Sequence, residues 1–367
     1  MRVVYFIDHL RPDGTQQVLT QLVRGLAERG HSQAVVCLND SWDAMVLESL
    51  RSAGCQVRSV GKAALVGGNG LVATWRWLNR EHFDAAVTLL FVSDVIGRSL
   101  ARAAGVPHVV TYLQARNINY TGWQRWLVRG SMRWADRVVI CSQNLRDFAV
   151  QVEGAPQKKV CVIPHGVRIN GACQTSGGRA LRDEFCIPAD RFLVGSLGRL
   201  TYQKGYDLLL DALAHMQEIS VQVLIAGSGE LLPQLQSQAE RLGIQDCVHF
   251  AGYRRDVTQI LQAIDVYAQP SRFEGMPLAI LEAMAASCPI VASAVDGNCE
   301  LIEDGVTGWL VPAEDSRALA HALHTSLSNS QESHRRGQAA CKRARDQFGL
   351  EQMFDRWEIV LGGGNVS

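Results

Sequence analysis

Two glutamates stand eight positions apart in the segment SRFEGMPLAILEAMA (271–285), which otherwise has the composition of a protein core. Pro277 is a favourable first residue of a helix, and LAILEAMAA continues with strong helix formers, so we expect a helix that begins near Met276. Glu274 precedes this helix and Glu282 lies about five residues into it. The free N–H groups and the positive dipole end at such a helix N-terminus suit a phosphate group.

The two carboxylates indicate a second kind of ligand group. Ionised carboxylates would repel a phosphate, but they accept hydrogen bonds from hydroxyl groups, and each can take two at once. A rise of about 1.5 Å per residue places Glu282 roughly 7–8 Å beyond the helix start. This spacing fits a ligand with a central diphosphate and a hydroxyl-bearing ring at either end, which describes a nucleotide sugar. The alternative is that Glu274 is a solvated loop residue and Glu282 lies on the polar face of the helix.

A second charged segment, GRLTYQKG (198–205), follows the apolar run FLVGSL and precedes the helical pattern YDLLLDAL. Arg199 and Lys204 are therefore expected at the carboxyl end of a strand, open toward the same site as the glutamates. An arginine binds a diphosphate through two N–H groups, and a lysine adds a compact charge. The alternative is a pair of exposed surface cations.

Strand-like and helix-like segments alternate along the chain. The strand-like runs lie at 2–8, 33–38, 55–60, 84–90, 108–113, 137–142 and 160–164, and then at 192–198, 221–227, 247–252, 266–271 and 289–293. Apolar strands joined by helices predict parallel sheets covered on both faces. The Gly-rich stretch 166–185 is the best linker candidate. We therefore expect an α/β protein with two parallel sheets, whose ligands bind beyond the carboxyl ends of the strands in a cleft between them.

Composition excludes several classes of protein. The chain has 367 residues, enough for two domains, with 47% hydrophobic and 20% charged residues. Its formal net charge of zero argues against a dedicated nucleic-acid binder. Residues 1–165 nevertheless carry 19 Lys/Arg against 12 Asp/Glu, and the remainder carries 17 against 24. A basic first half suggests an anionic partner there, and a coincidence of surface composition is the alternative.

Cysteine spacing and the distribution of apolar residues predict the compartment. The ten cysteines form no C-x-x-C pair and several lie in strand-like runs, so we expect buried thiols in a reducing compartment, with neither disulfides nor a zinc site. The start, MRVVYFID, lacks the layout of a signal peptide, and the longest apolar stretches fall short of the roughly 20 residues that a spanning helix needs. We therefore expect a cytoplasmic protein that does not cross a membrane.

The two charged segments together resemble those of the retaining glycosyltransferases often called family 4, or glycosyl transferases group 1, which have the GT-B fold. Both the Glu-x7-Glu pattern of 274–282 and the Gly-Arg-x4-Lys-Gly pattern of 198–205 match that family. Further segments resemble its glycine loop with the first helix, its domain junction and its closing segment, namely DGTQQVLTQLVRGLAERGH (13–31), ADRVVICSQNLRDF (135–148), VIPHGV (162–167) and ELIEDGVTGWLVP (300–312). The resemblance implies two Rossmann-like, doubly wound domains that face a central cleft. Residues 1–165 would form the acceptor-side domain, to which a helix at about 350–362 returns, and residues 166–349 would bind the nucleotide sugar.

The resemblance also implies roles for particular residues. Glu282 would hold the ribose hydroxyls and Glu274 those of the donor sugar, whereas Arg199 and Lys204 would neutralise the leaving diphosphate. Glu274, Arg199 and Lys204 are thus the candidate catalytic residues. Gly14 would let the backbone pass close to the donor phosphate. The other donor-binding candidates are Gly275, Met276, Pro277, Leu278 and, in the loop that would hold the base, Tyr253 and Arg254. Members of the family need no metal and this sequence has no D-x-D triplet, so we expect neither a metal nor a cofactor beyond the nucleotide-sugar co-substrate.

Two departures from the family pattern concern the first domain. Many members have a histidine after the strand that corresponds to 108–113, and here that position appears as Leu113. Arg116 and Asn117 are the candidates to replace its polar contacts on the acceptor side, the alternative being two ordinary loop residues. The junction usually reads Pro-Asn-Gly and here contains His165, which we expect to be structural because a lone histidine is weak evidence for acid–base work.

The segment 119–137 combines tryptophans and arginines with no acidic residue before Asp136. A helix of this kind fits an anionic membrane surface, so the protein would lie at the inner face of the cell membrane. The alternative is a helix that buries its tryptophans in the first domain and leaves its arginines in water.

These inferences predict a metal-independent, retaining glycosyltransferase. It would move a sugar from a UDP- or GDP-sugar to a glycan or lipid-linked glycan, in the synthesis of a bacterial surface polysaccharide. One rival is a nucleotide-sugar epimerase of the same architecture, which would isomerise the donor without an acceptor. Another is a non-catalytic protein that binds nucleotide sugars. A dehydrogenase is weaker, because HLRPDGT stands where G-x-G-x-x-G would follow the first strand. The residues leave the base, the sugar, the acceptor and the linkage open.

Overall fold

The protein, seen in a computed structural model, consists of two units. The structure describes residues 1–367 except residues 12, 118–119, 170–175, 217–219 and 367. One unit comprises Met1–His165 and Leu350–Ser367, and the other comprises Gly166–Gly349.

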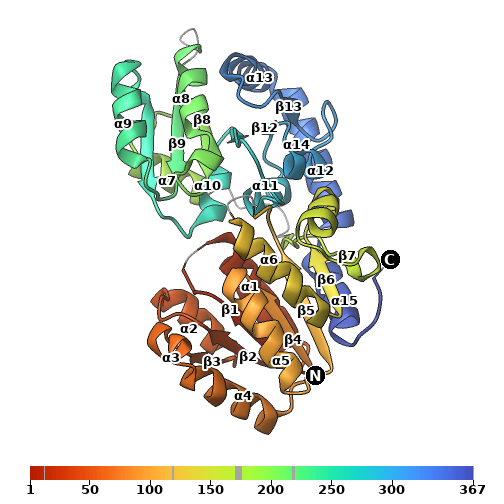
Figure 1. The fold of residues 1–367 in the computed structure, drawn as a ribbon. Helices are drawn as coiled ribbons and strands as arrows, with labels where there is room; N and C mark the ends of the chain where they lie inside the picture. The colour runs from red at the N-terminus through yellow and green to blue at the C-terminus, as the bar shows by residue number, and fades with distance from the viewer. Residues whose placement is uncertain (12, 118–119, 170–175, 217–219, 367) are drawn as a thin grey trace. The chain divides into compact units, whose positions relative to one another are not determined.

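The first unit contains a parallel sheet of seven strands (Figure 1). The strands are β1 (Arg2–Ile7), β2 (Ser32–Cys37), β3 (Gln56–Ser59), β4 (Ala85–Leu89), β5 (His108–Leu113), β6 (Arg137–Ile140) and β7 (Val160–Val162). The helices are α1 (Gly14–Glu28), α2 (Ala44–Ser52), α3 (Lys62–Val66), α4 (Asn69–Glu81), α5 (Arg98–Ala103), α6 (Gly122–Ser131) and α15 (Leu350–Leu361), with short π or 3-10 segments η1 (Ser93–Gly97), η2 (Met132–Trp134), η3 (Gln143–Leu145), η4 (Phe148–Val152) and η5 (Gln157–Lys159). The strand order is β3-β2-β1-β4-β5-β6-β7. The numbering falls from β3 to β1 and rises from β4 to β7, so the order in which the chain adds strands reverses between β1 and β4.

The second unit repeats this plan with six parallel strands. They are β8 (Phe192–Leu197), β9 (Val221–Ala226), β10 (Val248–Gly252), β11 (Val266–Gln269), β12 (Ile290–Ser293) and β13 (Trp309–Val311). The helical segments are α7 (Ser176–Glu184), α8 (Tyr206–Ala214), α9 (Leu232–Arg241), α10 (Val257–Ala263), α11 (Leu278–Ala285), α12 (Asp296–Leu301), α13 (Ser316–Ser328) and α14 (Ser330–Gln347), with η6 (Tyr202–Lys204) and η7 (Gln245–Cys247). The order is β10-β9-β8-β11-β12-β13, and β8 and β11 flank the reversal. Such a switch point places a crevice at the carboxyl ends of the two strands beside it.

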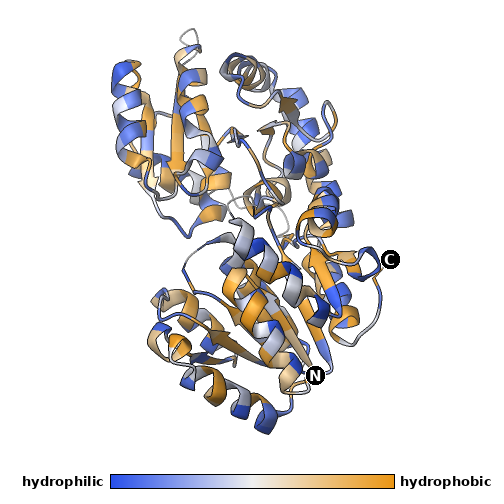
Figure 2. Ribbon diagram, viewed as in Figure 1, coloured by the Kyte–Doolittle hydropathy of each residue, from blue (hydrophilic) through white to orange (hydrophobic). Residues whose placement is uncertain are grey.

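Hydrophobic burial explains both sheets. Along β1, Val3 to Ile7 are all fully buried, and β4 is buried at every position. Strands that are covered on both faces need continuous apolar runs instead of alternation, and Figure 2 shows the strands of each unit as mainly hydrophobic. Each unit therefore has its own apolar core, with β4 and Trp77 in one and β9 with α8 in the other.

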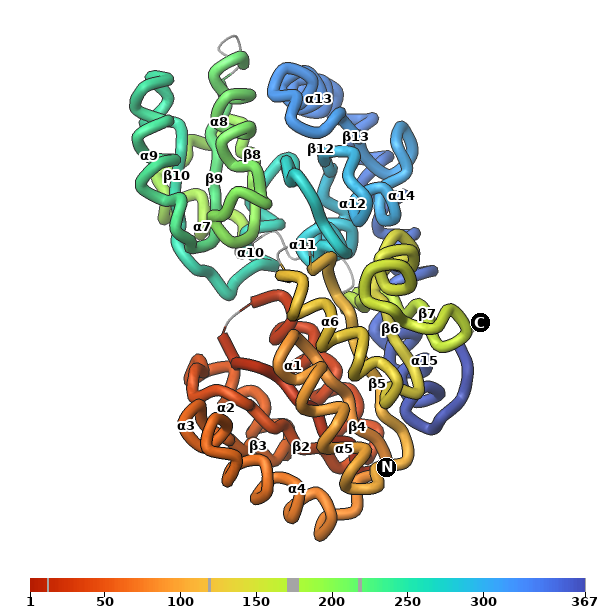
Figure 3. Tube along the Cα trace, in the orientation of Figure 1, coloured from red at the N-terminus to blue at the C-terminus, as the bar shows by residue number. Residues whose placement is uncertain are grey.

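The last helix belongs to the first unit, although it follows the second in sequence. Helix α15 packs against α1 and β5 (Figure 3). Its Trp357 is fully buried and its ring lies edge-on to Tyr112, with 4.9 Å between the ring centroids. Arg29 at the end of α1 forms ion pairs with three acidic side chains of α15, at 2.6 to 2.7 Å: Glu351, Asp355 and Glu358.

The predicted α/β architecture of two parallel sheets is confirmed, with three local corrections. The sequence missed β13, and it missed α7 in the predicted linker 166–185, of which residues 170–175 lie outside the described residues. Helix α7 forms because Leu181 is buried and Arg182 donates to the carbonyl of Ala263 at 2.9 Å. The described cysteines are free thiols; Cys186 and Cys299 are exposed although buried thiols were predicted, and Cys173 lies outside the described residues.

Candidate functional site

Neighbouring strands bring the two charged segments together in the second unit. Strand β8 pairs with β11, which aligns Gly195 with Tyr267, so the turns that follow these strands emerge side by side. The main-chain N–H of Arg272 donates to the carbonyl of Gln203 at 2.8 Å. Gly205 has a φ of +65°, and a Cβ there would lie 2.1 Å from the carbonyl oxygen of Pro270. Only glycine permits both the backbone conformation and this close contact.

The central contact joins Lys204 to Glu274. The Nζ of Lys204 lies 2.6 Å from Oε1 of Glu274, and the side chains are 16% and 6% exposed. The same carboxylate accepts hydrogen bonds from Ser271 at 2.7 Å, Gln269 at 2.9 Å and Gln203 at 3.3 Å. Four donors therefore surround this one carboxylate. The ammonium group of Lys204 thus pairs with Glu274 in this structure, and its contact with a diphosphate stays a prediction.

A further residue holds the turn that carries Lys204. The guanidinium of Arg272 contacts both carboxylate oxygens of Asp207, at 2.9 and 2.6 Å, and donates to the carbonyl of Tyr202 at 3.0 Å. It lies 4.1 Å from the centroid of the Tyr202 ring and 3.0 Å from Glu314. The sequence analysis did not predict a role for Arg272, although it stands two positions before Glu274 in the segment 271–285.

Helix α11 begins slightly later than predicted. Pro277 is its N-cap, with an extended ψ of 118°, and Leu278 is the first helical residue. Met276 precedes a proline and is therefore disfavoured in the helical conformation, so it is not the first helical residue. Glu282 is half-buried on this helix. Burial raises the pKa of Tyr267, and the negative charges of Glu274 and Glu282 add to this effect, so both acids act on one hydroxyl group.

Among the remaining donor-side candidates of the second unit, Met276 and Pro277 are buried, whereas the charged and aromatic candidates are more exposed. Arg199 has an exposed side chain in the turn 198–205. Tyr253 is 57% exposed after β10. Arg254 beside it contacts both oxygens of Asp256, at 2.9 and 2.6 Å, and both oxygens of Glu184, at 2.5 and 2.9 Å. These ion pairs raise the pKa of Arg254 and give it a structural role that the sequence did not suggest.

The candidates in the first unit lie at the carboxyl ends of its strands. Gly14 is the first residue of α1, and a Cβ added there would meet nothing within 4 Å. Leu113 ends β5 and is buried. Arg116 is exposed and donates to the carbonyl of Asn144 at 3.5 Å. Asn117 donates to the buried carboxylate of Glu153 at 3.3 Å. The junction residue His165 is buried, with its ring edge-on to Tyr112 at 6.2 Å, as a structural histidine would be.

Buried charges that the sequence did not single out lie near Asn117. Burial raises the pKa of Asp94 to about 7, partly opposed by Arg98, whose Nη2 lies 3.3 Å from the carboxylate. Burial likewise raises the pKa of Asp8 and of Glu153. Asp8 accepts hydrogen bonds from two main-chain N–H groups after β4, at 3.0 and 2.7 Å. This cluster could not be predicted from the sequence, because its members lie in loops and helical segments that are far apart in the chain.

The segment 119–137, of which residue 119 lies outside the described residues, forms α6 and η2. Trp123 and Trp126 are 61% and 72% exposed, so the alternative in which these tryptophans are buried is wrong. Arg129 and Arg133 are also exposed, although Arg129 donates to the carbonyls of Gln151 and Val152 and the guanidinium of Arg133 lies 4.3 Å from the ring centroid of Trp134. The exposed surface of this segment is thus both aromatic and basic.

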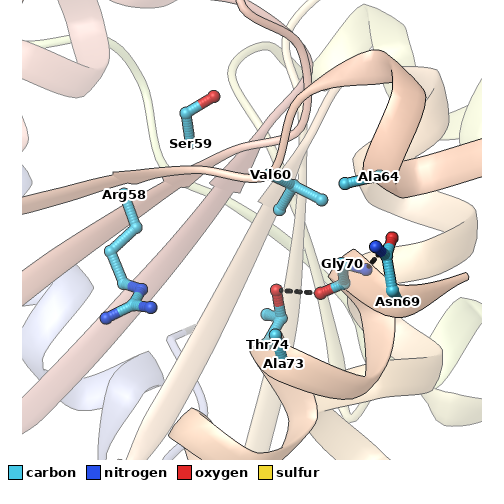
Figure 4. Close-up of a pocket in the computed structure, with 8 residues that line it drawn as sticks. All are labelled: Arg58, Ser59, Val60, Ala64, Asn69, Gly70, Ala73 and Thr74. Carbon is cyan, nitrogen blue, oxygen red and sulfur yellow. Dashed lines mark hydrogen bonds between the residues drawn. The ribbon is translucent and has the colours of Figure 1, made fainter.

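A separate cavity of 240 Å³ lies beside β3 in the first unit (Figure 4). Its lining comprises Arg58, Ser59, Val60, Ala64, Asn69, Gly70, Ala73 and Thr74. Thr74 donates to the carbonyl of Gly70 at 2.8 Å, and Asn69 accepts from the N–H of Gly70 at 2.9 Å. Because these polar groups bind one another, the cavity is a weaker candidate than the Glu274 site. Within the described part of the chain, no group of three or more His, Cys, Asp or Glu residues is placed to hold a metal ion.

Comparison with known families identifies the chain. The family described as "Glycosyl transferase 4-like domain" matches residues 13–166, and "Glycosyl transferases group 1" matches residues 179–343. The chain belongs to the group 1 glycosyltransferases. The predicted family is therefore confirmed. The matches fall on both units, and the second includes the segment with Lys204 and Glu274.

Two relatives and one solved structure illustrate the similarity. The UDP-Gal:alpha-D-GlcNAc-diphosphoundecaprenol alpha-1,3-galactosyltransferase of Escherichia coli is 26% identical over 69% of this chain and 68% of that protein. The D-inositol 3-phosphate glycosyltransferase of Xylanimonas cellulosilytica is 30% identical over 69% of this chain and 60% of that protein, so less than two thirds of that relative is matched. The crystal structure of Anabaena Alr3699/HepE in complex with UDP and glucose has a TM-score of 0.88 at 23% identity, over 98% of both chains. This likeness confirms the GT-B fold.

Proposed function

We propose that this glycosyltransferase moves a sugar from a nucleotide-sugar donor to a glycan or lipid-linked glycan acceptor, in the synthesis of a surface polysaccharide. The observation that carries the proposal is the Lys204–Glu274 pair at the carboxyl ends of β8 and β11, in front of helix α11. A cation, two acids and a helix N-terminus at a switch point form a site for a polyhydroxylated anion. The E. coli relative uses a UDP-sugar and a diphosphoundecaprenol-linked acceptor according to its name, which supports the same classes here.

The roles of individual residues are part of the proposal. Glu274 accepts hydroxyl groups of the donor sugar, and Glu282 accepts those of the ribose. Lys204 and Arg199 stabilise the diphosphate as it leaves, and donor binding then shares Lys204 between the phosphate and Glu274. Tyr253 is the base-stacking candidate in preference to Arg254, because the guanidinium of Arg254 already contacts two carboxylates. The backbone at 275–278 completes the part of the donor site that the second unit provides.

A binding panel followed by kinetics tests this function. UDP, GDP and ADP are compared by thermal shift, since a ligand that binds only the folded form raises its stability. Sugar donors with the preferred base are then assayed for hydrolysis and for transfer. We expect Glu274→Ala and Lys204→Ala to lower kcat by about 10²- to 10³-fold. Lys342→Ala, which removes an exposed cation paired with Asp346 on α14, is the matched control. Wild-type protein that binds none of the nucleotides would refute the proposal.

We propose further that the reaction retains the anomeric configuration and needs no metal. NMR of the product identifies the anomer, and an unchanged rate in the presence of a strong chelator tests metal independence. An inverted product, or a rate restored only by a divalent cation, would contradict this.

The same assays separate the two rivals. An epimerase would convert the donor to an isomeric nucleotide sugar with no acceptor present. A non-catalytic binding protein would show the thermal shift without turnover of any donor.

The membrane contact is also a proposal, and it rests on the exposed rings of Trp123 and Trp126. Indole rings favour the interface between headgroups and acyl chains. None of the described helices is both long and apolar enough to cross a bilayer, so the contact would be peripheral, at the cytoplasmic face. Flotation with anionic liposomes at low salt should capture the wild type and Trp75→Gln, which removes an exposed tryptophan from α4, but not a Trp123→Gln/Trp126→Gln double variant. Equal flotation of all three, or of none, would remove the idea.

A further inference from the structure

Three buried polar side chains lead to Glu274 from the end of β11. Tyr267 and Gln269 belong to that strand and Ser271 follows it, and none of them is more than 1% exposed. A buried polar group destabilises a fold unless it finds a hydrogen-bond partner. The remaining residues of the strand, Val266 and Ala268, are apolar, so the polar series needs an explanation.

The hydrogen bonds that join these side chains to one another and to Glu274 run in one direction, and the hydroxyl of Tyr267 also lies 3.4 Å from the carbonyl oxygen of Leu197. The hydroxyl of Tyr267 donates to Oε1 of Gln269. Nε2 of Gln269 donates to Oγ of Ser271 at 2.7 Å and to Oε1 of Glu274 at 2.9 Å, and Oγ of Ser271 donates to the same Oε1 at 2.7 Å. The reversed amide of Gln269 would set its oxygen against the carboxylate, so the network fixes the amide orientation.

The two oxygens of Glu274 are consequently not equivalent. Oε1 accepts from Gln269, from Ser271 and from Nζ of Lys204 at 2.6 Å, and three donors fill its acceptor capacity. Among the described residues, Oε2 accepts only one hydrogen bond, a long one of 3.3 Å from Gln203. The sequence treated the carboxylate as two equal acceptors, and the structure removes that symmetry.

We propose that Tyr267, Gln269 and Ser271 are positioning residues that bind Oε1 of Glu274 and leave Oε2 as the one oxygen that accepts a hydroxyl of the donor sugar. This inference rests on the proposed function. It makes the polar series specific for the sugar, because its hydrogen bonds end on Glu274. Loss of a member should weaken the use of the nucleotide sugar and leave binding of the nucleoside diphosphate unchanged.

Deletion of single hydrogen bonds tests the positioning role. Ser271→Ala removes one donor to Oε1, Gln269→Met removes the amide at similar volume, and Ser271→Thr keeps the hydroxyl. Ser196→Ala is the matched control, because Ser196 is an equally buried serine on β8 that donates to the carbonyl of Ala268 at 2.7 Å. The substrate is whichever of UDP-glucose, UDP-galactose and GDP-mannose gives the largest thermal shift with wild-type protein.

The readouts are kcat/KM for that donor, Kd for its nucleoside diphosphate, and Tm. We expect Ser271→Ala and Gln269→Met to lower kcat/KM by about 10- to 100-fold, the range for hydrogen bonds to a charged group, with Kd unchanged within about twofold. Ser271→Thr should keep most of the activity. Ser196→Ala should lower Tm about as much as Ser271→Ala does, without a comparable loss of kcat/KM.

A second experiment tests the single oxygen. In Glu274→Gln the three donors around Oε1 hold the amide oxygen there, so an N–H donor replaces Oε2. The test uses donor analogues that each lack one sugar hydroxyl. An analogue without the hydroxyl that binds Oε2 makes this hydrogen bond with neither protein, so Glu274→Gln and the wild type should use that one analogue equally well. Two such analogues would overturn the assignment of Oε2. The positioning role alone would be overturned if the wild type is active and Ser271→Ala has the same kcat/KM as Ser196→Ala. It would also be overturned if Ser271→Ala weakens binding of the nucleoside diphosphate as much as it lowers kcat/KM. A wild type that uses no nucleotide sugar would refute the proposed function and this inference with it.

Discussion

Substitution of Gly297 by alanine should displace the loop that carries Glu274. Gly297 lies near the start of α12, where a Cβ would stand 2.3 Å from the carbonyl oxygen of Gly275 and 3.1 Å from the carbonyl carbon of Glu274. Real Cβ atoms essentially never come closer than 3.0 Å to another atom, so the carbonyl of Gly275 has to move away. These are backbone atoms, and no side-chain rotation relieves the contact.

The size of the effect follows from the geometry of the site. A displacement of about 1 Å at a reacting group lowers the rate by about 10²-fold. It also lengthens the 2.6 Å contact between Lys204 and Glu274, which depends on the placement of both loops. We therefore expect kcat/KM for the nucleotide-sugar donor to fall by about two orders of magnitude in Gly297→Ala, while the variant remains folded.

Steady-state kinetics with the preferred donor, together with Tm, measure this prediction. Gly130→Ala is the matched control, since a Cβ on this glycine of α6 meets nothing within 4 Å. It should leave kcat/KM unchanged and raise the unfolding free energy by up to about 1 kcal/mol through helix propensity. If folded Gly297→Ala keeps kcat/KM within about twofold of the wild type, the close contact does not position Glu274 and the reasoning is refuted.

Three further predictions follow from other contacts. Lysine in place of Arg272 cannot bind both oxygens of Asp207, so Arg272→Lys should lower kcat/KM for the donor by about 10-fold with little change in Tm. An unchanged kcat/KM would show that Arg272 does not hold the turn that carries Lys204. Gly25→Ala would place a Cβ 2.0 to 2.5 Å from ring atoms of Phe354, so the unfolding free energy should fall by about 1–3 kcal/mol, and a second substitution, Phe354→Leu, should recover part of the loss; denaturant titration measures both. Burial raises the pKa of Asp94 from 3.8 to about 7, so between pH 4 and 7 the native state keeps a proton that the unfolded chain releases. Asp94 therefore lowers the unfolding free energy as pH rises through this range, by at most about 1.4 kcal/mol per pH unit. Asp94→Asn should reduce the fall of Tm with pH, and curves of Tm against pH that are parallel for the variant and the wild type would contradict the raised pKa.

Local patterns predicted most elements of the fold, because a strand that is covered on both faces needs a continuous apolar run wherever it lies in the sheet. The strand at 108–113 has the predicted bounds, and β1 and β9 differ from prediction by one residue at one end. The misses have local causes. Strand β13 is only three residues long, and α7 contains two glycines in its first turn, which favour a loop in a sequence-based prediction. The start of α11 was misplaced because Pro277 takes the extended conformation of an N-cap instead of the first helical position that proline favours.

For the site, the sequence by itself determined which chemistry is present: two cations and one acid in turns that follow strands, and a second acid in the next helix, in the pattern of the group 1 glycosyltransferases. Only the tertiary structure decided which of these groups meet. Lys204 and Glu274 are 70 residues apart in the chain, and their contact exists because β8 and β11 are neighbours in the sheet. Tertiary packing also decided that the two oxygens of Glu274 differ and that Arg272 holds the turn of Lys204. It likewise brought the guanidinium of Arg254 to the carboxylate of Glu184. A hydrogen bond depends on placement to within a few tenths of an ångström, and strand order and loop packing set that placement where residue type and spacing do not.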